Sequence, residues 1–197
     1  MARPQKYKQA QVMGAVSELF QSQGYRATSI DQLLEVSQLS RSSLYHGFGN
    51  KEALYLLVLD QIAIQTTTLY KNLATSSEPE LFLRLFFQSY RPDDSAHAPG
   101  QGCLLVNTVV ELADSEPALV ERALEYLKLA EVSLAKYFNN AQLAKQLPQH
   151  LNPVALAKYF MNVKKGLMVS VRHGASLHDL TDVIETSLLI LKPTNAR

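Results

Sequence analysis

The chain has 197 residues, of which 47% are hydrophobic and 19% are charged, so it contains enough apolar material to bury a core and disorder over most of its length is excluded. Glycine and proline contribute eight residues each, while Leu, Ala, Glu, Gln and Lys are plentiful, which predicts an all-α protein. One cysteine cannot form an intramolecular disulfide, and no apolar run approaches the roughly 20 residues of a membrane span. The N-terminus is basic but lacks the apolar stretch of a signal peptide, so we expect a cytoplasmic protein without a membrane partner.

The net charge of +1 is divided unevenly along the chain. Residues 1–51 carry three more basic than acidic side chains, whereas the remaining residues carry two more acidic than basic ones. Only the first quarter of the chain therefore favours a polyanionic partner. An excess of this size is common on ordinary solvated surfaces, so nucleic-acid binding needs support from a motif.

Three helices are predicted at the start of the chain. The first ends near Gly24 and carries an apolar stripe at helical spacing, made of Val12, Ala15, Val16, Leu19 and Phe20. The second covers about residues 28–37, because its first hydroxyl residues are followed three positions later by side chains that complete a capping box. The third is capped by Ser40 and ends in the turn 47–49. Residues 28–47 therefore have the pattern of helix, turn and helix.

Capping residues and first-turn prolines mark the later helices. We expect helices over about 51–74, from Ser77, over 103–113, from Ser115, over 153–174 and from Ser176 to the residue before Pro193. With the first three, this gives about nine helices, of which the last two form a hairpin. Residues 91–102 are rich in Pro, Gly, Asp and Ser and are expected to form a loop.

The helix predicted over 153–174 is apolar on more than one side and must be covered on two sides. One cover is a second copy of the chain, in a self-complementary two-fold contact. The alternative, in which all of these residues belong to the core of one chain, stays open. The candidate dimerisation residues are Phe160, Val163, Leu167, Ile184 and Leu188.

A helix-turn-helix binds DNA when its short second helix enters the major groove and its first helix crosses the backbone. The second helix then needs small or polar side chains at its start, with phosphate donors around them. The residues suited to base edges are Arg41, Ser42 and Ser43, and those suited to phosphates are Thr28, Tyr45, His46 and Lys51. Two short helices joined by a tight turn also occur in proteins that never meet DNA, and each of these residues has an ordinary structural explanation.

The joint spacing of these residues resembles the DNA-binding domain of the TetR family of transcriptional regulators. The resemblance covers residues 10–54 without a gap and rests on Ala15, Leu19-Phe20, Gly24-Tyr25, Thr28-Ser29-Ile30, Leu39-Ser40-Arg41, Leu44-Tyr45-His46, Phe48 and Asn50-Lys51-Glu52-Ala53-Leu54. It implies that the site residues above contact DNA and that Leu44 and Phe48 pack the domain. It also implies a homodimeric regulator, in the family most often a repressor, on a palindromic operator.

Three positions depart from the family pattern. The turn before Ser40 lacks its usual glycine, so a left-handed Gln38 is expected at a cost of about 1 kcal/mol relative to glycine. Ser42 replaces a frequent glycine, and Gly47 stands where an aromatic residue or histidine is usual. These departures concern which operator is bound rather than whether DNA is bound.

The resemblance divides the chain into a DNA-binding domain at residues 1–50 and a helical ligand-binding and dimerisation domain at residues 51–197. It implies an unidentified small-molecule effector whose binding changes the separation of two DNA-reading heads. Aromatic and polar candidates for the effector site are Thr66, Phe82, Phe86, Tyr90, Asn107 and Tyr126. Each of them could instead be simple core.

Cys103 is a further candidate in the effector site. It follows Gly102 at the predicted start of a helix, where the helix dipole favours a reactive thiolate. The run Gly102-Cys103-Leu104-x-x-Asn107 resembles a branch of the family in which some repressors sense electrophiles or oxidants through a cysteine. The alternative is an inert buried thiol packed beside Leu104.

Enzyme and metal sites have little support in the sequence. His173 and His178 are five residues apart across a glycine, Cys103 has no partner at ligand spacing, and neither a phosphate-binding glycine loop nor a nucleophile elbow is present. We therefore expect no cofactor, no metal and no catalytic residue. The alternatives to a regulator are a helical thiol enzyme with Cys103 as nucleophile and His97 as base, or a small-molecule carrier that never binds DNA.

Overall fold

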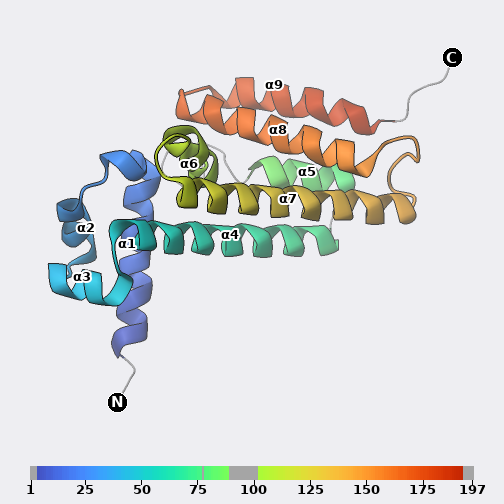
Figure 1. Cartoon of the computed structure of the whole chain (residues 1–197). Helices are drawn as coiled ribbons and strands as arrows, with labels where there is room; N and C mark the ends of the chain where they lie inside the picture. The colour runs from blue at the N-terminus through green and yellow to red at the C-terminus, as the bar shows by residue number, and fades with distance from the viewer. Residues whose placement is uncertain (1–3, 77, 89–101, 193–197) are drawn as a thin grey trace. The chain divides into compact units, whose positions relative to one another are not determined.

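The computed structural model describes residues 4–76, 78–88 and 102–192. Within these ranges the protein contains nine α-helices, one short 3₁₀ helix and no β-strand, which confirms the predicted all-α class (Figure 1). The helices are α1 (Pro4–Ala27), α2 (Ile30–Ser37), α3 (Arg41–Phe48), α4 (Lys51–Ser76), α5 (Pro79–Gln88), α6 (Leu104–Leu112), α7 (Pro117–Leu143), α8 (Pro153–Arg172) and α9 (Leu177–Leu188), followed by the 3₁₀ helix Leu189–Leu191. None of the described helices combines the length and the hydropathy that crossing a membrane requires.

The helices form two compact units. The N-terminal unit comprises Met1–Ile64 and Cys103–Glu125, and the C-terminal unit comprises Gln65–Gly102 and Tyr126–Arg197. Helices α4 and α7 each contribute residues to both units. The N-terminal unit is therefore larger than the helix-turn-helix segment, because α6 and the first part of α4 are included in it.

The core of the N-terminal unit is built around Tyr55 of α4. Its ring meets the rings of Phe20 and Tyr25 edge-on, with centroids 4.7 and 5.0 Å away. Its hydroxyl lies 2.8 Å from that of Thr108, which itself donates to the carbonyl of Leu104 in α6, so the tyrosine hydroxyl is the donor of the pair. This burial raises the pKa of Tyr55 well above its ordinary value. One aromatic residue thus ties α1, α4 and α6 together.

Helix α1 is kinked at Gly24, whose φ of 82° and ψ of −175° are not helical. The amides of Tyr25 and Arg26 beyond the kink donate to the two carboxylate oxygens of Glu111, at 3.2 and 2.7 Å. The positive φ requires glycine at position 24, and a Cβ there would also displace the same carboxylate from these two amides. The Arg26 guanidinium also donates to the Ser115 hydroxyl at 2.8 Å, which adds a second link between α1 and the segment after α6.

Local capping sets the bounds of α2 and α3. Ser29 forms the predicted capping box with Gln32, and the Ser40 hydroxyl accepts from the amide of Ser43. Gln38 has φ 55° and ψ 28°, which confirms the left-handed turn residue expected from the sequence. The end of α3 lies within the predicted turn 47–49, because the helix continues through Phe48 and is capped by Gly49 (φ 78°).

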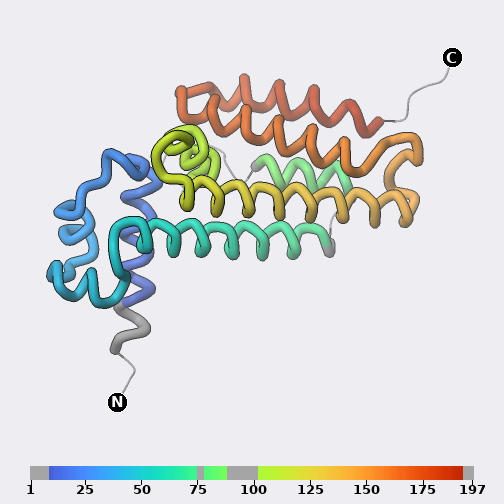
Figure 2. The backbone as a smooth tube through the Cα atoms, viewed as in Figure 1, coloured from blue at the N-terminus to red at the C-terminus, as the bar shows by residue number. Residues whose placement is uncertain are grey.

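The C-terminal unit is a set of helices around an aromatic core. α8 and α9 lie side by side in opposite directions, which confirms the predicted hairpin (Figure 2). Their buried side chains join those of α5 and α7, including Phe82, Phe86, Phe138, Phe160 and Leu188. On the surface, the guanidinium of Arg84 in α5 bonds to Glu80 and to Glu185 of α9.

Three of the five expected dimerisation residues are buried within one chain. Phe160, Leu167 and Leu188 belong to the core of the C-terminal unit, and Val163 and Ile184 are half-buried against it. An apolar helical stripe does not reveal whether its cover comes from the same chain. Here the rings of Phe87 in α5 and Phe138 in α7 pack against Phe160. The exposed apolar side chains of the hairpin and of the 3₁₀ helix that follows it are a different set, comprising Val154, Tyr159, Val169, Leu177, Val183, Leu189 and Ile190.

Candidate nucleic-acid interface

Helix α3 presents a continuous polar surface to solvent. Its buried residue Leu44 fixes the helix on the N-terminal unit, and Phe48 is half-buried at its end, as expected for packing residues. All the side chains proposed from the sequence to contact DNA from α3 are exposed, namely Arg41, Ser42, Ser43, Tyr45 and His46. An exposed tyrosine is informative, since 42% of Tyr45 is accessible although the ring would be favourable to bury.

The first residue of α3 forms an ion pair that the sequence did not predict. The Arg41 guanidinium donates to the carboxylate of Asp31 at 2.7 Å, with both side chains largely exposed. Asp31 was assigned only to the start of α2. An exposed pair of this kind contributes about 0–1 kcal/mol, so a DNA base or phosphate can compete for the guanidinium at low cost.

Two of the expected phosphate donors are engaged inside the protein. Thr28 is 1% exposed, and its hydroxyl donates to the carbonyl of Gly24 at 2.7 Å. The Lys51 ammonium lies 4.3 Å from the centre of the Tyr25 ring, a cation–π contact at the start of α4. Burial lowers the pKa of Lys51, against the opposite effect of nearby carboxylates. Tyr45 and His46 are therefore the expected phosphate residues with exposed side chains.

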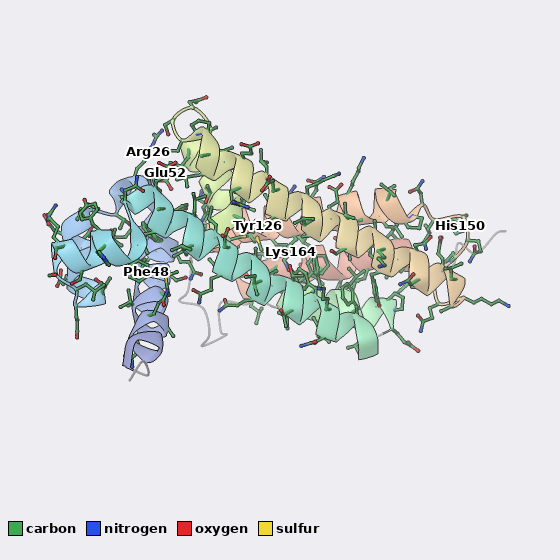
Figure 3. The ribbon with its side chains drawn as sticks, turned by 60° about the horizontal axis from the view of Figure 1, so that its bottom comes forward. Arg26, Phe48, Glu52, Tyr126, His150 and Lys164 are labelled. Carbon is green, nitrogen blue, oxygen red and sulfur yellow. The ribbon has the colours of Figure 1, made fainter. Side chains whose placement is uncertain are left out.

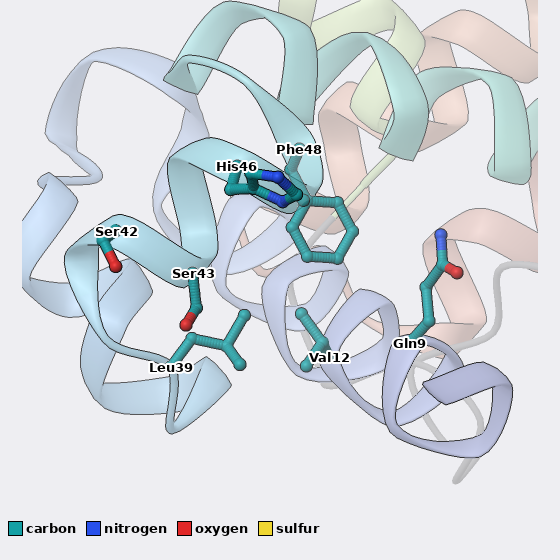
Figure 4. A pocket seen from close by; sticks show the side chains of 8 residues that line it. Gln9, Val12, Leu39, Ser42, Ser43, His46 and Phe48 are labelled. Atoms are coloured by element: carbon teal, nitrogen blue, oxygen red, sulfur yellow. The ribbon is translucent and has the colours of Figure 1, made fainter. Parts of the chain in front are cut away.

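An open cavity of about 510 Å³ lies beside α3 (Figure 4). Its lining comes from the start of α1, the turn before α3 and one face of α3, and comprises Gln9, Val12, Leu39, Ser42, Ser43, His46, Gly47 and Phe48. Three of these residues were expected to contact DNA. The sequence did not indicate Gln9 or Val12, because their proximity to α3 depends on how α1 packs.

The expected effector residues are divided between the two units. Phe82 and Phe86 line a cavity of about 80 Å³ in the C-terminal unit. Thr66 and Tyr126 belong to the same unit but do not line this cavity, whereas Cys103 and Asn107 belong to the N-terminal unit. Tyr90 lies outside the described residues, as does His97, the base of the alternative thiol enzyme.

Several residues in or next to the small cavity were not predicted from the sequence to bind an effector. Tyr70 and Tyr137 contribute rings, with the Tyr137 ring stacked 4.0 Å from that of Phe82. Lys164, labelled in Figure 3, is only 4% exposed. Its ammonium donates to the Tyr70 hydroxyl and, at 2.8 Å, to the carbonyl of Phe86. Tyr70 follows Thr66 by one helical turn, a signal that could have been used. No pattern singles out a buried lysine in α8.

Cys103 is buried and stands at the first position before α6, as predicted, although its thiol does not cap the helix. The buried state agrees with the inert interpretation, and the position at the helix start agrees with the reactive one. Among the residues that the structure describes, no group of three or more His, Cys, Asp or Glu side chains could hold a metal ion.

Two family models match the chain. Residues 13–58 match the bacterial regulatory proteins of the tetR family, and residues 83–186 match the tetracyclin repressor-like C-terminal domain. The chain belongs to the TetR family. The second match alone covers more than half of its length, so the family is established for both parts of the chain.

Relatives and solved structures agree with this TetR-family assignment. The HTH-type transcriptional repressor ComR of Escherichia coli K12 is 25% identical over 195 residues, covering 94% of this chain and 90% of ComR. A TetR-family regulator from Cytophaga hutchinsonii has the same fold, with a TM-score of 0.85, 20% identity and 99% of each chain covered. A cysteine mutant of the regulator CifR, solved with double-strand operator DNA, has a TM-score of 0.80 and 19% identity, with 92% of this chain and 95% of CifR covered. The curated relatives are transcriptional regulators, which leaves the enzyme and carrier hypotheses without support.

Proposed function

We propose that this TetR-family regulator is a repressor that binds a palindromic operator as a homodimer. Residues 1–50 would read the DNA, and residues 51–197 would bind the effector and dimerise. The observation that carries the proposal is the exposed polar surface of α3, held on the N-terminal unit by Leu44. A short helix displayed in this way fits the major groove of B-DNA.

The contacts follow from the side chains of α3. Arg41 is suited to a guanine edge once it leaves Asp31, while Ser42 and Ser43 are short enough for the groove floor. Tyr45 and His46 are the proposed phosphate contacts. Thr28 and Lys51 have supporting roles. The Thr28 hydroxyl fixes the chain at the end of α1 through its bond to the Gly24 carbonyl. Lys51 lies over the Tyr25 ring at the start of α4, where backbone amides favour an anion.

The proposed dimer uses the exposed apolar residues of the α8–α9 hairpin. Val169, Val183 and Ile190 are each at least 40% exposed, and an isologous contact would bury two copies of each. Sedimentation velocity of Val183→Glu tests this surface, with Val132→Glu on α7 as the control of similar exposure. A monomeric Val183→Glu beside a dimeric control supports the surface, and two dimeric variants contradict it.

Release of the operator has two proposed routes. A small molecule could bind in the C-terminal unit, where the cavity beside Phe82 and Phe86 offers an aromatic lining. Alternatively, an electrophile could alkylate the Cys103 thiolate, in keeping with the Gly102-Cys103-Leu104 run. Iodoacetamide labelling of native protein tests the thiol route, which is abandoned if Cys103 reacts only in denaturant.

DNA binding is tested by selecting bound fragments from the source genome and titrating the best one by fluorescence anisotropy at several salt concentrations. We expect a palindromic site and a steep salt dependence for the wild type. The variant Tyr45→Phe/His46→Ala should bind more weakly than the wild type at every salt concentration, because it lacks two of the proposed donors to phosphate. His150→Ala, an exposed histidine of the C-terminal unit, is the matched control. No enriched site, or equal binding by the variant and the control, would refute the proposal.

A further inference from the structure

Lys164 of α8 is the only charged residue that is buried within the part of the chain that the structure describes. Its ammonium lies 3.7 Å from the centre of the Phe86 ring and 4.6 Å from that of the Tyr70 ring. It also donates to the Phe86 carbonyl and to the Tyr70 hydroxyl. Removing an ammonium from water is costly, and its field is screened less inside a protein than at the surface. A positive potential is therefore present at these two aromatic residues.

Tyr70 and Phe86 both line the cavity of about 80 Å³ in the C-terminal unit. Lys71, an exposed residue of α4, adds a second ammonium group to the lining. No acidic side chain is among the lining residues. The charges at this cavity therefore favour an anionic occupant and disfavour a cationic one.

The volume of the cavity limits the apolar part of an occupant. An apolar cavity of about 150 Å³ holds one benzene ring. A cavity of about 80 Å³ has room for roughly half as many carbon atoms, about three or four. The buried side chains of Phe82, Phe86 and Leu134 provide an apolar lining for an alkyl group of this length.

The polar group of the occupant should meet the Tyr70 hydroxyl. Tyr70 accepts a hydrogen bond from the Lys164 ammonium, and a hydroxyl that accepts from a cation becomes a stronger donor. A carboxylate is an acceptor only and gains most from such a donor. The bond from Lys164 to the Phe86 carbonyl also caps the last turn of α5, so the lysine has a structural role that the test must separate from a role in binding.

We propose that the effector of this regulator is a short-chain aliphatic carboxylate. Its alkyl group packs against Phe82 and Phe86, and its carboxylate accepts from the Tyr70 hydroxyl. Lys164 positions and polarises that hydroxyl and stabilises the negative charge of the ligand. The inference rests on the proposed release by a small molecule in this cavity and names the chemical class of that molecule.

The test compares the binding of butyrate, butyramide, butylammonium and benzoate to the protein without DNA, by NMR titration. Butyramide has nearly the shape of butyrate but no charge. We expect the wild type to bind butyrate about tenfold more tightly than butyramide, the order expected for an interaction with a charged group. Benzoate should bind more weakly than butyrate because its ring exceeds the cavity.

Two variants separate binding from structure. Lys164→Met fills a similar volume without the charge, and Tyr70→Phe keeps the ring and removes only the hydroxyl, so a decision remains even if Lys164→Met does not fold. Each should reduce the preference for butyrate over butyramide to about twofold or less while butyramide binding stays unchanged. A purely structural role of Lys164 would not alter this preference. Lys158→Met, the same substitution at an exposed lysine of α8, is the control and should keep the tenfold preference.

Each result supports or overturns a stated part of the inference. Equal binding of butyrate and butyramide, or tighter binding of butylammonium or benzoate, overturns the ligand class while the DNA-binding proposal stands. A preference that persists in folded Lys164→Met and in Tyr70→Phe overturns the assigned binding site. Butyrate that binds as expected but does not release the operator in anisotropy titrations is not the effector. If the wild type selects no DNA, the proposed function fails, and the NMR titration still decides which ligand class the cavity takes.

Discussion

The carboxylate of Glu111 is the clearest place to test how the N-terminal unit is held together. It accepts hydrogen bonds from the amides of Tyr25 and Arg26, which follow the non-helical residue Gly24. The substitution Glu111→Ala leaves both amides without this acceptor. It also removes a negative charge from the last turn of α6, where the helix dipole disfavours it.

These effects have opposite signs, and their magnitudes decide the outcome. A hydrogen bond to a charged group contributes about 1.5–3 kcal/mol, but the Arg26 amide is exposed and water can replace its acceptor. The Tyr25 amide is partly buried, so most of the free-energy cost of losing its acceptor remains. Removing the negative charge from the C-terminal end of α6 stabilises the protein by about 0.3–1 kcal/mol. We therefore expect Glu111→Ala to lower the free energy of unfolding by about 1.5 kcal/mol, and Glu111→Gln, which retains one acceptor, by about half as much.

Urea unfolding measures the loss, and amide hydrogen exchange locates it. Glu121→Ala is the matched control, because Glu121 is an exposed residue of α7, and it should change stability by less than about 0.5 kcal/mol. The amides of Tyr25 and Arg26 should exchange faster in Glu111→Ala than in the wild type. A Glu111→Ala variant as stable as the control, with unchanged exchange at both amides, would refute the reasoning.

Three further predictions concern caps, charge and pH. Ser40→Ala removes the side-chain acceptor for the Ser43 amide and should cost about 1 kcal/mol in urea unfolding, together with weaker operator binding. Asp31→Asn should raise operator affinity in anisotropy titrations, because it frees Arg41 and removes a negative charge next to α3, while stability falls by less than about 1 kcal/mol. Burial raises the pKa of Tyr137 to about 12, so the unfolded chain loses this proton first and stability should fall as pH rises from about 10 to about 12. In Tyr137→Phe that part of the pH dependence should disappear from unfolding curves.

Local chemistry explains what could be predicted from the sequence. A cap acts on amides two or three residues away, so Ser29 and Ser40 fixed the starts of α2 and α3 without any tertiary information. The left-handed Gln38 was expected from the resemblance to the family, which usually has a glycine in the turn before Ser40. The end of α3 lies in the predicted turn 47–49, where Gly49, which has positive φ, stops the helix.

Contacts between distant residues account for what could not be predicted. Glu111 and Arg26 are 85 positions apart, and no periodicity connects them. Thr28 has the position expected of a phosphate donor, but its hydroxyl bonds within the chain and it is buried. Phe160 has the spacing of an interface residue, yet its cover comes from its own chain. For Thr28 and Phe160 the sequence indicated the kind of contact correctly but not the partner.

The arrangement of α6 bears directly on how a signal could reach the DNA-reading helices. Cys103 stands immediately before this helix and Glu111 lies in its last turn, so the proposed reactive thiol and the acceptor for the α1 kink are carried by the same nine-residue element. Both residues belong to the N-terminal unit, together with α2 and α3. Alkylation that displaced the first turn of α6 would therefore also shift the Glu111 carboxylate at the kink of α1, because one helix carries both residues. An effector bound beside Phe82 in the C-terminal unit would have to act through α4 or α7, the helices shared by both units, so the two proposed routes of release depend on different elements.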